Sequence, residues 1–331
     1  MERTKGRWLA LAIGLPLIAA TVLAGCSNKT DKSNSSNKSG GTVKHGKITI
    51  AVITHGSRGD AFWDVVKNGA EAAGKDLGVT VNYQSDGDPG NQARLIDQAV
   101  NKKVSGLVVS MANPDALETS IKNAVSAGIP VITINSGEDK SKAFGAIAHV
   151  GQNESIAGQG AGAKLKDNGV HKLLCVIHEA NNIGLQQRCA GAQQGLGGSE
   201  ETLQVDINNL ADAQNRIKGK LTADSSIDGV LTLNPAIGVV AVTAIGDAHS
   251  QAKIATFDLN GDVVTAIKGG KMLFAVDQQQ YEQGYLPIVM LKLYLENNNT
   301  VGGGQPVLTG PGFVTKENAS TVEKLTKAGT R

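Results

Sequence analysis

Aromatic side chains are scarce in this chain of 331 residues, which contains five Phe, four Tyr and two Trp. Charge of one sign is also lacking, because 32 Lys and Arg stand against 30 Asp and Glu. A nucleic-acid-binding surface needs a concentrated basic patch and often aromatic rings on which bases stack. We therefore expect no nucleic-acid partner.

Common enzyme motifs are also missing from the sequence. No G-x-G-x-x-G follows the first predicted strand, and neither G-x-x-x-x-G-K-[ST] nor G-x-S-x-G occurs. The glycine-rich stretch 158–162 (GQGAG) has the wrong spacing and lies in a helix-like segment. The six histidines are scattered without the spacing of metal ligands. We predict no catalytic residue, no metal site and no cofactor.

The N-terminus has the features of an export signal. A basic start (MERTKGR) precedes an apolar run from Trp8 to Leu23, which is short for a membrane span. The sequence Leu23-Ala24-Gly25-Cys26 then resembles the lipobox of bacterial lipoproteins. The resemblance implies that residues 1–25 are a signal peptide and that Cys26 carries lipid. An ordinary N-terminal membrane helix is the alternative.

Residues 26–46 are predicted to be a disordered tether. They are mostly Ser, Asn, Lys and Gly, which bury too little apolar surface to offset the entropy lost on ordering. The expected location is the outer face of the cytoplasmic membrane, with the body held there by lipid.

The remaining residues, 47–331, alternate strand-like and helix-like patterns. Such alternation predicts an α/β fold with parallel sheets covered by helices on both faces. The length favours two lobes, each with about five strands, and the strand count is too high for an eight-stranded barrel. The clearest predicted strands are 48–53, 79–83, 106–110, 130–134, 143–150, 172–177, 202–207, 229–233, 253–257 and 272–276.

The loop after the first strand carries Asp60, Phe62 and Trp63. Ligands of open α/β sheets bind at the carboxyl ends of the strands, which is where this loop lies. Neighbouring helical positions point about 100° apart, so we expect that a single helix face cannot easily bury both aromatic rings. Ordinary packing of helix 62–77 against the sheet is the alternative interpretation.

The order of these units resembles the sugar-binding type I periplasmic binding proteins of the ribose-binding kind, over residues 47 to about 313. The resemblance implies two doubly wound lobes joined by three crossovers, with ligand held in the cleft. One lobe would comprise 47–150 and 279–308, and the other 151–278 and 309–331. It also implies a monomer that takes a sugar or polyol and passes it to an ABC permease.

Binding residues are carried over by position. The resemblance implies a ligand site formed by Asp60, Phe62, Trp63, Asn135, Ser136, Asn153, Arg188, Asn208, Asn234, Asp258 and Gln278. Several positions depart from the ribose pattern. Asp60 replaces an Asn, the pair Asn135-Ser136 replaces Asp-Arg, and Asn208 (or Asn209) replaces an aromatic. These changes favour a ligand other than ribose, such as another aldose, a polyol or an inositol.

Residue chemistry alone also favours such a ligand. Carboxylates, amides and a guanidinium supply the donors and acceptors that vicinal hydroxyls need. Helix capping is the alternative for any single Asn or Asp, but capping does not call for Arg188 or Gln278. The pair His178-Glu179, which closes a predicted strand, is interpreted as a loop pair near the ligand.

Cys175 and Cys189 remain once Cys26 is assigned to lipid. In an exported protein such a pair is commonly bonded, so we predict a disulfide, with two buried thiols as the alternative.

Other classes of function are less consistent with the sequence. An enzyme would need one of the missing motifs, and a repressor on this fold would need a helix-turn-helix where the signal lies. A sensory partner of a membrane receptor would use the same pocket, so the sequence does not separate sensing from transport.

Overall fold

The computed structural model describes residues 46–57 and 59–331. The predicted signal peptide, Cys26 and nearly all of the predicted tether therefore lie outside the described residues. The described residues form one compact unit. None of the described helices is both long enough and apolar enough to cross a membrane.

The predicted α/β architecture of two lobes is confirmed, and each lobe is built on one six-stranded sheet. The first sheet has the strand order β11-β5-β4-β3-β1-β2. Its strands are β1 (Thr49–Thr54), β2 (Thr80–Ser85), β3 (Gly106–Ser110), β4 (Val131–Ile134), β5 (Ala148–Gln152) and β11 (Val307–Gly310). The accompanying helices are α1 (Ala61–Leu77), α2 (Pro89–Asn101), α3 (Pro114–Ser126), α4 (Glu138–Ser141), the 3₁₀ turn η1 (Lys142–Phe144) and α10 (Gln280–Asn297).

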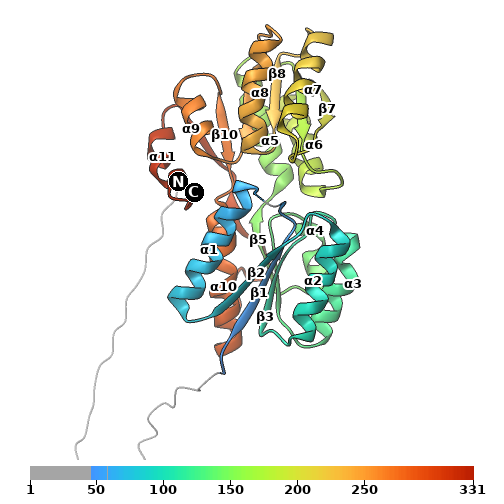
Figure 1. Ribbon diagram of the computed structural model, residues 1–331, viewed down its shortest axis with the longest axis vertical. Coiled ribbons are helices and arrows are strands. Elements are labelled where there is room, and N and C mark those ends of the chain that lie inside the picture. The colour runs from blue at the N-terminus through green and yellow to red at the C-terminus, as the bar shows by residue number, and fades with distance from the viewer. Residues whose placement is uncertain (1–45, 58) are drawn as a thin grey trace, which may run out of the picture. The chain divides into compact units, whose positions relative to one another are not determined.

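The second sheet repeats the pattern with the order β12-β10-β9-β8-β6-β7. Its strands are β6 (Lys172–Ile177), β7 (Ser199–Gln204), β8 (Gly229–Thr232), β9 (Lys253–Phe257), β10 (Phe274–Asp277) and β12 (Gly312–Thr315). Its helices are α5 (Glu154–Asp167), α6 (Ile183–Leu196), α7 (Leu210–Ala223), α8 (Pro235–Asp247), α9 (Gly261–Lys268) and α11 (Ala319–Lys327). Figure 1 shows these two groups of elements one above the other.

The chain passes between the sheets three times, after β5, after β10 and between β11 and β12. The estimate of about five strands per lobe missed the short edge strands β11 and β12. Both are four residues long and glycine-containing, and neither shows a clear alternation of apolar and polar residues. The residue boundaries proposed above for the lobes stay a prediction.

Local sequence explains where the helices begin. Asp88-Pro89, Asn113-Pro114 and Asn234-Pro235 each place a capping side chain directly before a proline. The capping oxygen accepts a hydrogen bond from a backbone N–H of the first turn that has no partner within the helix. Proline suits the next position because it has no backbone N–H that would need a partner there. These starts fix the helix N-termini at the carboxyl ends of the strands.

Helices α5 and α6 pack at backbone distance because glycines line their contact. A Cβ atom at Gly158 would lie 2.2 Å from the Arg188 carbonyl oxygen, and one at Gly191 would lie 2.3 Å from the Ser155 oxygen. The stretch GQGAG therefore makes a helix contact, and that contact sets the position of Arg188. Glycines bring α1 and α10 together in the same way, since a Cβ at Gly284 would lie 1.9 Å from the Val66 oxygen.

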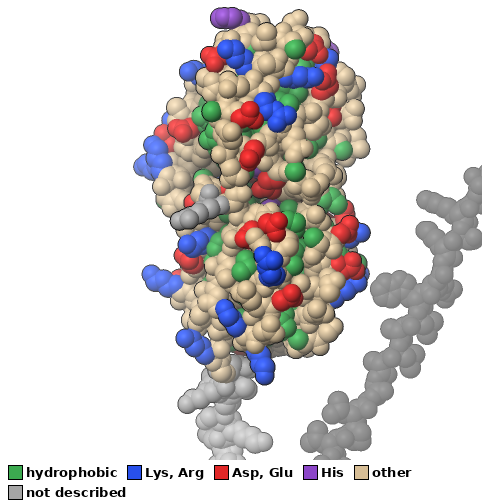
Figure 2. Space-filling model, turned by 45° about the vertical axis from the view of Figure 1, so that its right-hand side comes forward, with side chains coloured by type: hydrophobic (Ala, Val, Ile, Leu, Met, Phe, Trp, Pro, Cys, Tyr) green, Lys and Arg blue, Asp and Glu red, His purple; other side chains and the backbone are tan. Residues whose placement is uncertain are grey.

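Each sheet is covered on both faces by apolar clusters. In the first lobe Ile50, Val52 and Ile288 belong to the cluster on one face, and Ile53 and Leu117 to the cluster on the other. On the face of the molecule shown in Figure 2, acidic and basic side chains are interspersed. The core therefore lies within each lobe and leaves the carboxyl ends of the strands to polar residues.

Candidate functional site

A small polar pocket lies where the carboxyl ends of both sets of strands meet. The side chains leave little free volume in it, because only about 20 Å³ is open to the centre of a water-sized sphere. Its lining comes from both lobes and consists of His55, Asp60, Phe62, Trp63, Asn135, Ser136, His178, Glu179, Asn182, Leu185, Arg188, Leu233, Asn234, Asp258 and Gln278. We call this space the inner pocket.

Nine of the eleven predicted ligand residues line the inner pocket, and Asn153 and Asn208 do not. Asn153 caps α5, where its side chain accepts a hydrogen bond from the Ile156 N–H. Asn208 is exposed and donates a hydrogen bond to Asp206. Asn153 therefore caps a helix outside the lining of the inner pocket, and Asn208 lines two outer openings instead.

Strand ends supply much of the lining, as parallel topology requires. His55 follows β1, Asn135 follows β4, His178 follows β6 and Asp258 follows β9. Asn135 and Asp258 have backbone φ angles of 61° and 68°, a left-handed conformation that Asn and Asp tolerate better than most side chains. This conformation turns the chain immediately after the strand.

Helix starts supply further lining residues. The Asp60 side chain caps α1 by accepting a hydrogen bond from the Phe62 N–H at 3.0 Å. The Asn234 side chain caps α8 in the same way, accepting a hydrogen bond from the Ala236 N–H at 2.8 Å. Both residues therefore cap a helix and line the pocket, so the two interpretations of these positions are not exclusive.

Both aromatic residues of the first helical turn are buried, with Phe62 6% and Trp63 5% exposed. Both rings are thus buried, contrary to the expectation that a single helix face cannot easily bury both. Gly56 has no side chain, and a Cβ there would lie 2.3 Å from the indole, so the loop before α1 covers Trp63 directly. The rings of His55 and Phe62 both pack edge-on against Trp63, with distances between ring centroids of 4.7 and 4.9 Å.

Arg188 is held rigidly in the second lobe. Its Nε and Nη2 groups donate to the two carboxylate oxygens of Glu154 at 2.6 and 2.9 Å, and both side chains are buried. The guanidinium lies 4.6 Å from the Phe257 ring centroid, and its Nη1 lies 3.9 Å from an oxygen of Asp258. Glu154 was not predicted, because it faces Arg188 only once α5 and α6 are packed.

Buried amides connect the two lobes across the pocket. Ser136 donates to Asn182 at 3.2 Å, and Asn135 donates to Gln278 at 3.0 Å. Gln278 in turn donates to Asp258 at 2.8 Å. A main-chain hydrogen bond also connects the lobes, from the Ile183 N–H to the Ala112 carbonyl oxygen at 3.0 Å. Residues of the two lobes are therefore in direct contact around the inner pocket.

Burial shifts the pKa values of the ionisable groups in the pocket. It raises the pKa of Asp258 to about 7 in spite of the nearby Arg188, and that of Asp60 to about 6 in spite of the Phe62 N–H. It lowers the pKa of His55 to about 3, with Arg188 adding to the effect, and that of His178 to about 4. In each case the uncharged form is favoured, as expected where water is excluded.

Sequence reasoning missed several residues of the pocket, namely His55, Asn182, Leu185 and Leu233. His55 directly follows the first apolar strand, and Asn182 caps the helix that carries Arg188. Both positions could have been found by the rule that strand ends and helix starts face the site. His178 and Glu179 lie where the sequence placed them, beside the pocket.

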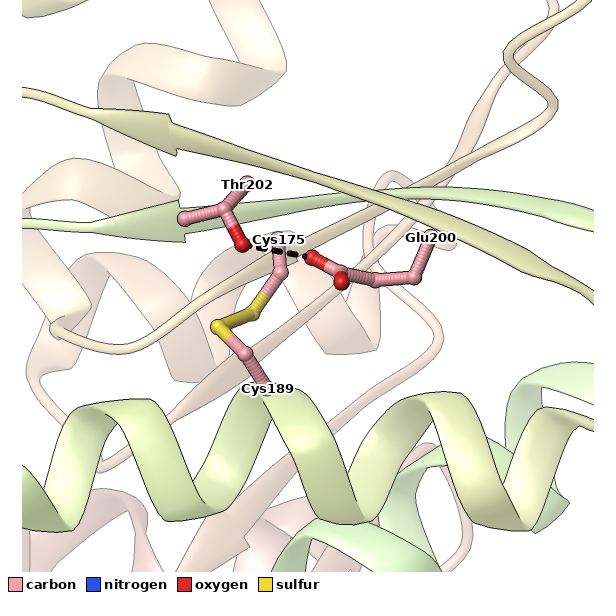
Figure 3. Close-up of a disulfide and its surroundings, with 4 residues drawn as sticks. All are labelled: Cys175, Cys189, Glu200 and Thr202. Carbon is pink, nitrogen blue, oxygen red and sulfur yellow. Dashed lines mark hydrogen bonds between the residues drawn. A yellow bond between two sulfur atoms is a disulfide. The ribbon is translucent and has the colours of Figure 1, made fainter.

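Cys175 of β6 and Cys189 of α6 form a disulfide, as expected (Figure 3). Glu200 lies beside the two sulfur atoms and accepts a hydrogen bond from Thr202. These three residues are the one group with metal-ligand proximity among the described residues, and bonded sulfurs are poor ligands. The disulfide ties strand β6 to the residue next to Arg188.

Comparison with known proteins places this geometry in context. Residues 50–299 match the family described as periplasmic binding protein domain. The ribose import binding protein of Haemophilus influenzae is 27% identical over 257 residues, covering 73% of this chain and 83% of that protein. A D-ribose/D-allose-binding protein of Pseudomonas aeruginosa is 26% identical, and the match covers 82% of this chain and 88% of that protein.

A solved structure is more similar. It is a carbohydrate transporter from Acidothermus cellulolyticus in complex with myo-inositol, with 44% identity and a TM-score of 0.85. The match covers 86% of this chain and all of that one.

Proposed function

Because this chain belongs to the periplasmic binding protein family, we propose that it captures a monosaccharide or polyol between its lobes and delivers it to an ABC importer. The observation that supports the proposal is the inner pocket, whose lining combines carboxylates, amides and one guanidinium from both lobes. Each hydroxyl of such a ligand donates once and accepts from others, so it needs this mixture of partners.

A six-membered cyclitol or a pyranose suits the pocket best. The myo-inositol complex of the relative that is 44% identical supports the cyclitol. Neutral Asn135 and Ser136 stand where ribose binders carry an Asp-Arg pair, which argues against ribose. Phe62 and Trp63 offer apolar ring surface to the C–H groups of the ligand.

Ligand binding is coupled to closure because partners of the ligand lie on both lobes. A ligand that contacts Asp258 and Asn135 together stabilises the closed form by its higher affinity for that form. The three chain crossings act as the hinge, and the closed surface is what the permease distinguishes.

Lipid at Cys26 completes the proposal, with the body outside the cytoplasmic membrane. Several acyl chains on one residue hold a protein firmly, whereas one chain binds only marginally. Mass spectrometry of detergent-extracted protein should find acyl groups on a mature N-terminal Cys26, and Cys26→Ser should release the protein from membranes. Unmodified Cys26 behind an intact signal would contradict this part.

Binding without catalysis is proposed as well. Ser136 is the hydroxyl of the inner pocket, and it donates to the side-chain oxygens of Asn135 and Asn182. No described histidine lies in hydrogen-bond contact with it, so the pocket does not form a serine–histidine pair.

A thermal-shift screen with pentoses, hexoses and polyols tests the proposed ligand class. At least one of these compounds should raise the melting temperature, because a ligand that binds only the folded state stabilises it. If none of them does, the ligand class is wrong.

A further inference from the structure

Acidic and basic groups around the inner pocket do not balance. Asp60, Glu179 and Asp258 line it, and Arg188 is the one Lys or Arg among its lining residues. Glu154 lies directly behind Arg188. Among the residues that the structure describes, four carboxylates therefore face one guanidinium, a formal charge of −4 + 1 = −3 when all are ionised.

The positive charge of Arg188 is already engaged. Glu154 binds it through two hydrogen bonds of 2.6 and 2.9 Å, whereas Asp258 approaches only to 3.9 Å. A bidentate arginine–carboxylate pair of this kind is nearly neutral as a unit. Little of its charge remains for Asp60, Glu179 or an anionic ligand.

The two histidines of the pocket do not supply the missing charge. His55 and His178 are buried, and burial holds their pKa values at about 3 and 4. They are neutral near pH 7 and act there as hydrogen-bonding groups.

Unpaired carboxylates shielded from water are costly, and either a proton or a cation relieves the cost. A single metal ion does not fit, because among the described residues the pocket holds no group of three ligand atoms close enough to share one. The carboxylates instead come from different segments of the lining, with Asp60 at the start of α1, Glu179 after β6 and Asp258 after β9. That spread suits an organic cation that also carries hydroxyl groups.

We propose that the ligands of the inner pocket include amino-substituted polyols, in which an ammonium group replaces one hydroxyl of a sugar or cyclitol and binds beside Glu179. This inference rests on the proposed function. Anionic ligands such as uronic acids should bind more weakly, because no free cation among the described residues lines the inner pocket.

Glu179 is the carboxylate best placed for the ammonium. It lies at the boundary between the inner pocket and a larger outer chamber, and its side chain is 17% exposed. Its Oε2 atom accepts from Asn182 at 2.6 Å and lies 3.6 Å from His55. Its Oε1 atom accepts no hydrogen bond from a described residue, since His178 comes only to 4.0 Å. One oxygen is therefore available to an ammonium donor.

Calorimetric titration of the full chain at pH 7.5 tests the proposal with matched probes. The pairs are myo-inositol with an amino-deoxy-inositol and D-glucose with D-glucosamine, and D-glucuronate is the anionic probe. In at least one pair the amine should bind about tenfold more tightly, since hydrogen bonds between ionised partners are roughly twice as strong as neutral ones. D-glucuronate should bind more weakly than D-glucose.

Two variants locate the effect. Glu179→Gln should reduce the ratio of amine to neutral affinity to about threefold or less, whatever it does to the separate affinities. Glu71→Gln changes an exposed residue of α1 outside the pocket and should leave the ratio unchanged.

The outcomes separate this proposal from the proposed function. If neutral sugars or cyclitols bind and the amines bind no more tightly, the preference for amines is wrong and the sugar-binding function stands. A ratio that survives Glu179→Gln also overturns the placement beside Glu179. If no amine, sugar or polyol binds at all, both proposals fail.

Discussion

Arg188 and Glu154 form a buried bidentate ion pair that joins helices α5 and α6 at the edge of the inner pocket. The pair presents the remaining Nη1 group of Arg188 toward Asp258. Among the described residues, Arg188 supplies the one guanidinium in the pocket lining, and Glu154 fixes its direction although it does not line the pocket itself.

Glu154→Gln should destabilise the protein by about 3–5 kcal/mol, because it leaves the Arg188 charge buried without its partner. Urea unfolding of wild type and variant measures the difference. Glu71→Gln breaks an exposed ion pair with Lys67 and should cost less than about 1 kcal/mol. Equal effects of the two substitutions would contradict the structural role of Glu154.

Gly158→Ala should destabilise the protein by about 1–3 kcal/mol, because its Cβ would lie 2.2 Å from the Arg188 carbonyl oxygen and would push α5 away from α6. Gly219→Ala in α7 is the matched control, since its Cβ meets nothing within 4 Å. Alanine suits a helix interior better than glycine by about 0.5–1 kcal/mol, so the control should be stabilised. Loss of stability in both variants would show that helix contact is not the cause.

Much of this architecture follows from the sequence because burial and periodicity act locally. The apolar run at 50–53 and the capped helix starts at Asp88 and Asn113 fix element type without reference to the rest of the chain. The edge strands β11 and β12 were missed because pairing partners far along the chain, β5 and β10, define them.

Topology alone brings several of the predicted site residues together. Asn135, Asn234 and Asp258 end parallel strands, so they must meet at one edge. The burial of Trp63 depends on the absence of a side chain at Gly56, and the role of Glu154 depends on two helices in contact. Asn153 shows the limit of alignment, since a residue aligned with a ligand contact caps a helix outside the lining of the inner pocket.

Replacing both Cys175 and Cys189 by alanine should lower the free energy of unfolding by about 3 kcal/mol. The bond closes a segment of 14 residues, and loops of this size restrict the unfolded chain by roughly that amount. Urea unfolding of the double variant measures the loss. Alkylation of unfolded wild type without reductant should modify neither residue, and two modified thiols would contradict the disulfide.

The difference in stability between wild type and Asp258→Asn should depend on pH. Burial raises the pKa of Asp258 to about 7, above its usual value of 3.8, so the folded state holds the proton more tightly than the unfolded state. The stability that this proton confers is fully present below about pH 4 and is lost as the pH rises through about 7. The neutral amide has no such loss, so the stability of Asp258→Asn relative to wild type should increase from pH 5 to pH 8.

Comparison with Asp258→Asn is needed because the buried histidines act in the opposite direction. His55 and His178 have pKa values lowered to about 3 and 4, so their contribution is present above about pH 6.5 and is lost as the pH falls. Both wild type and Asp258→Asn contain these histidines, so the histidine contribution cancels in the difference between their free energies of unfolding. A difference that stays constant from pH 5 to pH 8 in unfolding experiments without ligand would contradict the raised pKa.

Calorimetric titration with myo-inositol, or with the polyol that gives the largest thermal shift, tests most directly whether the two lobes hold a ligand at the inner pocket. Wild type should bind one molecule per chain. Asp258→Ala should remain folded by circular dichroism and lose at least about 1.5–3 kcal/mol of binding free energy, the contribution of a hydrogen bond to a charged group. Unchanged affinity in folded Asp258→Ala, or no binding of any polyol to wild type, would contradict the account.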